Sequence, residues 1–108
     1  MSNGFDDRKK AEEEKFAHDQ ELMFKALARR NYKLGLWVAE LLGLSGAEAE
    51  AYAKSVILAD LEEPGDDDVV RKVMADLRAK GVEMSEHRLR NRMARLMEEA
   101  REEIMREG

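Results

Sequence analysis

The spacing of apolar residues constrains the fold of this chain more than any other feature of its sequence. In several segments of the 108-residue chain, large apolar side chains recur at spacings of about three, four or seven positions, which places them on one face of an α-helix. Over residues 19–42 this stripe consists of Met23, Leu27, Leu34, Val38 and Leu41. No segment shows the strict alternation that is typical of a β-strand. The sequence therefore predicts an all-α fold.

Three further helical stripes follow, separated by glycine and proline. They consist of Tyr52, Val56 and Ile57, then Val69, Val70, Val73, Met74 and Leu77, then Leu89, Met93, Leu96, Met97, Ala100 and Ile104. Gly43, the Pro64-Gly65 pair and Gly81 interrupt the stripes, because these residue types commonly end helices. Four such segments in one small domain predict a four-helix bundle over residues 19–108.

Polar residues at the predicted helix starts indicate caps. Ser45, followed by Glu48 three residues later, has the pattern of a capping box. The aspartates at 66–68 would cap the third helix and stabilise the positive end of its dipole. Ser85 would cap the fourth helix.

Charge is distributed unevenly along the chain, whose formal net charge is -5. Residues 25–33 carry four bases and no acid, whereas residues 40–68 carry nine acids and a single base, Lys54. A basic block before a strongly acidic one in so short a chain favours helices that pair with each other. The acidic balance disfavours binding of nucleic acid by the whole domain.

Lys25, Arg29 and Lys33 are spaced four residues apart. Like charges at this spacing destabilise an isolated helix by about 0.3 kcal/mol per pair, so an acidic surface should face them. One candidate is the acidic turn at residues 60–68 of the same molecule. The other is an acidic or phosphate-bearing surface of a partner.

Two further features of the predicted helices have structural interpretations. Arg88, Arg92 and Arg95 recur on one side of the fourth helix, where we predict a solvated face. Trp37 lies within the first helix, where we predict that it anchors the core. Neither feature requires a ligand.

Residue types that carry catalysis or hold metals are scarce. The chain has no cysteine, which excludes disulfides and thiolate ligands. No serine has the context of a nucleophile elbow, and Gly43 and Gly46 lack the lysine and hydroxyl of a phosphate-binding loop. Neither histidine completes a Glu-x-x-His pair of a di-iron bundle, and we interpret Glu14, His18 and Glu21 as solvated residues. We predict no enzyme activity, no metal site and no cofactor.

Residues 1–18 depart from the helical pattern. Phe5 and Phe16 are their only large apolar residues after Met1, which is too few to offset an ordering entropy of about 1 to 2 kcal/mol per residue. The two aromatics lie eleven positions apart, so a helix here would continue the stripe of residues 19–42. We expect this segment to be mobile when it is alone. The residues alone favour a solvated tail with two incidental aromatics, and a segment that folds on a partner is the alternative.

Nothing in the sequence indicates export or membrane insertion. The opening residues lack the apolar core of a signal peptide. No apolar stretch approaches the roughly 18 residues of a membrane span. We expect a cytoplasmic protein.

Four sequence blocks in combination resemble a known family. They are Lys15-Phe16-Ala17-His18-Asp19, Ala28-Arg29-Arg30-Asn31, Leu34-Gly35-Leu36-Trp37 and Asp68-Val69-Val70-Arg71-Lys72-Val73. Over about residues 5–82 the chain resembles the inhibitory zeta subunit of the α-proteobacterial F-type ATP synthase. The fourth predicted helix matches this family in pattern only.

The resemblance implies a four-helix bundle whose N-terminal segment, residues 1–18, blocks ATP hydrolysis. The segment would fold into a cleft between subunits of the catalytic head, beside the central rotor stalk. The implied partners are the alpha, beta and gamma subunits of this head. The positions that match the family's inhibitory element are Phe5, Asp6, Asp7, Arg8, Lys15, Phe16, Ala17, His18 and Asp19. The resemblance also implies a location at the inner face of the bacterial membrane, reached through the synthase and without insertion into the bilayer.

Two other functions remain open on the residues alone. Lys25, Arg29 and Arg30 could hold the phosphates of ATP or ADP weakly, with Trp37 or Tyr32 near the base. A generic protein-interaction bundle also fits the composition. Both alternatives use the bundle rather than the N-terminal segment.

Overall fold

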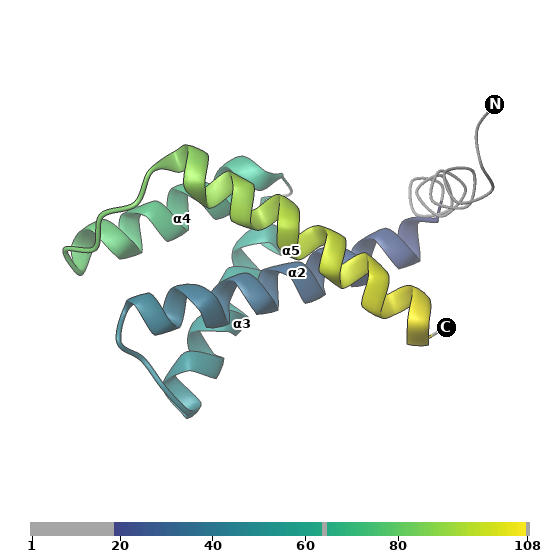
Figure 1. Cartoon of the computed structure of the whole chain (residues 1–108), viewed down its shortest axis with the longest axis horizontal. Coiled ribbons are helices and arrows are strands. Elements are labelled where there is room, and N and C mark those ends of the chain that lie inside the picture. The colour runs from purple at the N-terminus through teal and green to yellow at the C-terminus, as the bar shows by residue number, and fades with distance from the viewer. Residues whose placement is uncertain (1–18, 64, 108) are drawn as a thin grey trace.

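Four α-helices make up the computed structural model, which describes residues 19–63 and 65–107. They are α2 (Gln20–Leu41), α3 (Ala47–Glu62), α4 (Asp66–Ala79) and α5 (Glu86–Glu107) (Figure 1). The described residues contain no strand. The predicted all-α four-helix fold is therefore confirmed, while the predicted mobile segment, residues 1–18, lies outside the described residues.

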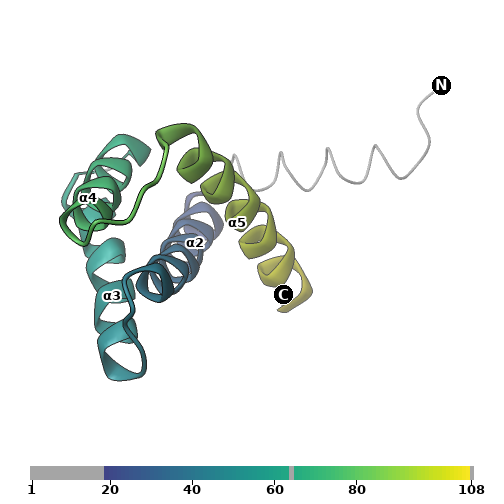
Figure 2. The ribbon, with the colours of Figure 1, turned by 60° about the vertical axis from the view of Figure 1, so that its left-hand side comes forward.

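Helix α2 occupies the centre of the arrangement. It lies between α3 and α5, and α4 packs against α3 and the first part of α5 (Figure 2). The start of α2 lies beside the end of α5, as the ion pair of Arg29 with Glu107 shows. Within the described ranges α3 and α5 do not contact each other, so the outer faces of these two helices are separate surfaces.

The main core draws on all four helices. Its buried members are Leu34, Val38, Leu42, Val56, Val69, Val70, Val73, Leu77, Leu89, Met93 and Leu96. Most of them belong to the stripes that the sequence predicts, and Trp37 packs against this cluster from a half-buried position. A second, smaller cluster around Ala26 and Ile104 joins the start of α2 to the end of α5.

Helix α2 buries more of its surface than a single apolar stripe predicts. Besides Leu34 and Val38 it buries three small residues, Ala26, Gly35 and Ala39. Gly35 lies so close to α3 that a Cβ atom built on it would stand 2.4 Å from the Cα atom of Ala53. The missing side chain thus permits the close approach of α2 and α3.

Two predicted helix caps are wrong. The N-cap of α3 is Gly46 rather than the predicted Ser45, and no side chain makes a capping hydrogen bond there. The φ of Gly46 is 57°, a backbone conformation that favours glycine. The N-cap of α4 is Gly65. The aspartates at 66–68 already lie in the first turn, where their charges still favour the positive end of the dipole.

The third predicted cap is confirmed, and it gives a stability prediction. The Oγ atom of Ser85 accepts a hydrogen bond from the backbone N–H of Arg88 at 3.1 Å, so Ser85→Ala is expected to destabilise the protein by about 1 kcal/mol. Ser45→Ala is the matched control and should change the free energy of unfolding by less than about 0.5 kcal/mol. Urea unfolding measures both variants. Equal losses in the two would contradict this assignment of caps.

Candidate functional site

The start of α2 is the point at which the predicted inhibitory segment joins the bundle. Asp19 is the N-cap of α2, and its Oδ1 atom accepts a hydrogen bond from the backbone N–H of Leu22 at 3.1 Å. Its carboxylate also lies at the positive end of the helix dipole. The other residues predicted for the inhibitory contact lie outside the described residues: Phe5, Asp6, Asp7, Arg8, Lys15, Phe16, Ala17 and His18.

The basic residues of α2 pair with the end of α5. The guanidinium of Arg29 donates two hydrogen bonds to the carboxylate of Glu107, Nη1 to Oε1 at 2.6 Å and Nη2 to Oε2 at 2.9 Å. Lys33 forms an ion pair with Glu103. The prediction that the acidic turn at 60–68 faces these cations is wrong, because the packing of α2 beside α5 brings two other acids to them.

Arg30 is the α2 cation that reaches the acidic turn. Its side chain is only 3% exposed, and its Nη1 atom donates to Oδ1 of Asp66 at 2.8 Å. Its Nε atom donates to Oδ1 of Asn31 at 3.0 Å, and Nδ2 of Asn31 donates to Oδ2 of Asp60 at 3.0 Å. These polar contacts connect α2 to the end of α3 and to the start of α4.

The residues predicted to contact a nucleotide are engaged within the protein. Arg29 and Arg30 form the ion pairs described above, and Lys25 lies 3.7 Å from an acid of its own helix in an exposed pair. The guanidinium of Arg92 lies over the ring of Trp37, 4.6 Å from the ring centroid. Arg92 was predicted to lie on a solvated face, but it is only partly exposed and packs on this ring. Nucleotide binding stays a prediction that would require some of these contacts to open.

The ion pairs between α2 and α5 predict a pH-dependent stability. Hydrogen bonds from Arg29 and Lys33 lower the pKa values of Glu107 and Glu103, respectively, below their usual 4.5. Because the folded-state pKa values are depressed, this stabilisation is present above pH 4.5 and is lost as the pH falls through the folded-state values. Wild type should therefore be more stable than the double variant Glu103→Gln/Glu107→Gln at neutral pH, and this difference in stability should shrink as the pH falls below 4.5.

Urea unfolding at several pH values measures this difference between wild type and variant. Glu99→Gln is the control, since Glu99 is exposed on the same helix and takes no part in the ion pairs that join α2 to α5 within the described ranges. A difference that persists unchanged at acid pH would contradict the assignment, because protonated carboxyl groups no longer attract the two cations.

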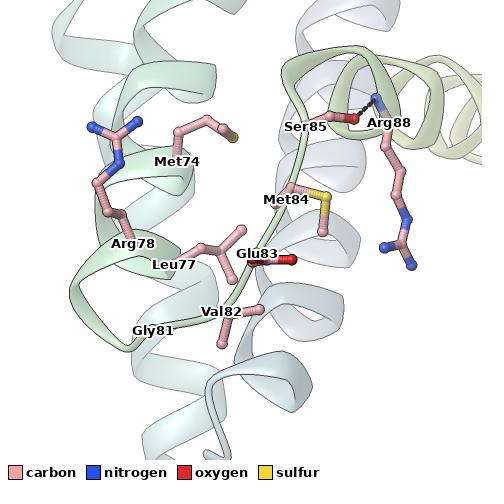
Figure 3. A pocket seen from close by; sticks show the side chains of 9 residues that line it. All are labelled: Met74, Leu77, Arg78, Gly81, Val82, Glu83, Met84, Ser85 and Arg88. Atoms are coloured by element: carbon pink, nitrogen blue, oxygen red, sulfur yellow. Dashed lines mark hydrogen bonds between the residues drawn. The ribbon is translucent and has the colours of Figure 1, made fainter.

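A hollow of about 690 Å³ lies beside the connection between α4 and α5. Figure 3 shows Arg78 and Arg88 on opposite sides of the methionines Met74 and Met84. Arg88 is exposed, as predicted. This hollow lies far from the start of α2 (Figure 1), so it is separate from the root of the predicted inhibitory segment.

Three large apolar side chains remain exposed on neighbouring parts of α2 and α3, and together we call them the apolar patch. They are Phe24, Leu58 and Leu61, which are 56%, 57% and 50% exposed. Phe24 and Leu61 also line a small pocket of about 140 Å³ together with Leu27 and Ile57. These residues were not predicted from the sequence as a site. The available signal was that Phe24 is large and apolar but lies beside the α2 stripe rather than in it.

The described residues offer neither a metal site nor a membrane span. In the ranges 19–63 and 65–107, no three acidic or histidine side chains are placed to hold a metal ion together. Glu14 and His18, considered above with Glu21, lie outside these ranges. None of the four helices described is both long and apolar enough to cross a bilayer.

Comparison with known proteins assigns the family. A family model for ATPase inhibitor subunit zeta matches residues 1–103. The chain belongs to this family. The zeta-family match includes the N-terminal segment and most of α5. For α5, the sequence alone had indicated a similarity to this family in pattern only.

A solved structure supports the fold of this zeta-family chain. A protein described as a solution NMR structure is 49% identical to it, with a TM-score of 0.70, over 81% of this chain and 99% of the other. No curated protein matches the chain significantly. The family assignment supports a regulatory role as an inhibitor that interacts with ATP synthase.

Proposed function

We propose that this zeta-family chain inhibits ATP hydrolysis by the catalytic head of an F-type ATP synthase, and that residues 1–18 form its inhibitory element. The observation that carries this proposal is the match to the ATPase inhibitor family over residues 1–103, which includes both that segment and the bundle. The segment enters a cleft between subunits of the head, beside the central rotor stalk. Rotation in the direction of hydrolysis then stalls.

The way in which α2 is held supports this mechanism. A segment that blocks rotation needs a firm attachment, and residues 1–18 lead directly into α2 through its N-cap, Asp19. Helix α2 contacts all three other described helices, and the buried Arg30 and Asn31 connect it to α3 and α4. A load applied to the segment is therefore passed to the whole bundle.

The composition of the segment indicates how it would bind. Burial of Phe5 and Phe16 in the cleft would stabilise the complex by about 2 to 3 kcal/mol each before the cost of ordering the segment. The segment also carries both acids and bases, which can pair with charges of the cleft. Since two aromatics alone give modest affinity, contacts of the bundle should add to it. The complex would lie at the inner face of the membrane through the synthase.

Reconstitution tests the proposal. Purified full-length chain is titrated against isolated catalytic head from an α-proteobacterium, and ATP hydrolysis is measured at each concentration. We expect saturable inhibition, with the chain and the head eluting together in size-exclusion chromatography. Full hydrolysis at a large molar excess of folded chain would contradict the proposal.

A further inference from the structure

We propose that the apolar patch, Phe24, Leu58 and Leu61, is a second contact with the catalytic head. Its partner is an apolar surface of the head with lysine or arginine at its edge. This inference rests on the proposed function and extends it from the N-terminal segment to the bundle. The bundle thereby takes part in binding directly rather than only carrying the segment.

The exposure of these side chains is the first observation. Among the described residues, Phe24, Leu58 and Leu61 are the large hydrophobic side chains with high exposure, and all three are at least half exposed. Leu58 precedes Leu61 by about one helical turn of α3, and grouped exposed apolar side chains mark interaction sites. Phe24 and Leu61 also flank a pocket of about 140 Å³, a volume comparable to one that can hold a benzene-sized group. A single apolar side chain of the partner fits there.

The charges around the patch indicate the chemistry of the partner. Glu62 and Glu63 are exposed and follow Leu61 directly, and Asp60 lines the pocket itself. Residues 40–68 contain nine acids and only one base, Lys54. An apolar surface edged with cations complements this patch, whereas an acidic surface would be repelled.

The position of the patch along the chain identifies the partner. Phe24 lies five residues after Asp19, the N-cap through which the inhibitory segment joins α2. Five residues of helix span about 7.5 Å, so a partner that holds residues 1–18 lies next to Phe24. Binding of the segment also raises the effective concentration of the patch to roughly millimolar, so the second contact can form even if it is weak alone.

Substitutions in the full-length chain test the proposal. Phe24→Ser and Leu61→Ser should each raise the concentration needed for half-inhibition of ATP hydrolysis by about tenfold. Arg78→Ser is the control, because Arg78 is a large, exposed side chain in the last turn of α4, outside the apolar patch. This control substitution should leave the concentration needed for half-inhibition unchanged. Thermal unfolding by circular dichroism establishes that all three variants are folded.

A charge-reversal pair tests the edge of the patch separately. Glu62→Lys/Glu63→Lys should slow association with the head, and this effect should shrink as salt is added. Glu98→Lys/Glu99→Lys is the charge-matched control on the exposed face of α5. Equal changes in both double variants would overturn the proposed cationic edge, because the effect would then reflect net charge alone.

The outcomes separate this inference from the proposed function. If wild type does not inhibit, the proposed function fails. If wild type inhibits and both patch variants inhibit equally well, only the second contact fails. Stronger inhibition by Phe24→Ser or Leu61→Ser would overturn it in favour of a patch that holds residues 1–18 of the same chain. Sedimentation could also show that wild type forms dimers and that the patch variants do not. If inhibition of ATP hydrolysis is then unchanged in these variants, the second contact with the head is overturned, and the patch instead binds a second copy of the chain.

Discussion

Removal of residues 1–18 is expected to abolish inhibition of ATP hydrolysis while the four-helix bundle stays folded. Both hydrophobic clusters and the polar contacts of Arg30 lie within the described residues that follow the segment. The truncated chain should therefore keep a cooperative thermal transition in circular dichroism. It should also retain weak binding to the catalytic head through the apolar patch, without slowing hydrolysis. The rate of ATP hydrolysis and the affinity of the truncated chain for the catalytic head, measured in parallel, test these two expectations.

A length-matched control isolates the chemistry of the segment from its bulk. A chain in which residues 1–18 are replaced by glycine and serine keeps a tail of equal length but lacks Phe5 and Phe16. It should inhibit no better than the truncated chain. Full inhibition by either the truncated or the glycine-serine chain would show that the bundle alone blocks the enzyme, and the inhibitory role of the segment would have to be abandoned.

The substitution Gly35→Ala is expected to destabilise the protein by about 2 kcal/mol, as measured by urea unfolding. Its new Cβ atom would stand 2.4 Å from the Cα atom and 3.0 Å from the Cβ atom of Ala53. Because one of these atoms belongs to the backbone of α3, a side-chain rotation cannot relieve the contact. Intrinsic helix propensity acts in the opposite direction, since Ala in a helix interior is favoured over Gly by about 1 kcal/mol.

Two control variants separate packing from propensity. Ala75→Gly, at an exposed position of α4, should cost about 0.5 to 1 kcal/mol through propensity alone. Adding Ala53→Gly to Gly35→Ala should restore stability only in part, because the Cα atom of residue 53 remains in place. If Gly35→Ala instead stabilises the protein, propensity dominates and the two helices can separate without cost.

Local features of the fold could be predicted because they depend on residues close in sequence. The stripes at residues 69–77 and 89–104 lie on buried helix faces, since helical periodicity alone decides which side chains share a face. Ser85 caps α5 as predicted, whereas Ser45 does not cap α3. The two serines look alike in sequence, but the N-cap of α3 is Gly46, which has a positive φ, and Ser45 precedes it.

The candidate site could be predicted in part. The family resemblance predicted residues 1–18 as the inhibitory element, and the family match includes them, but their individual contacts remain a prediction. The apolar patch escaped prediction because it combines residues of two helices. Only the packing of α2 on α3 brings Phe24 and Leu61 to the same pocket.

The helical class, the approximate extent of the four helices and the faces that form the main core all follow from the order of the residues, because they depend on local periodicity and on Gly and Pro breaks. The partners of the charged side chains depend on packing instead. Arg29 pairs with Glu107, 78 positions away, and Arg30 with Asp66, 36 positions away, although the two arginines are adjacent. Neighbouring residues on a helix point about 100° apart, so their partners depend on which helix packs on each side of α2, a choice made by long-range packing.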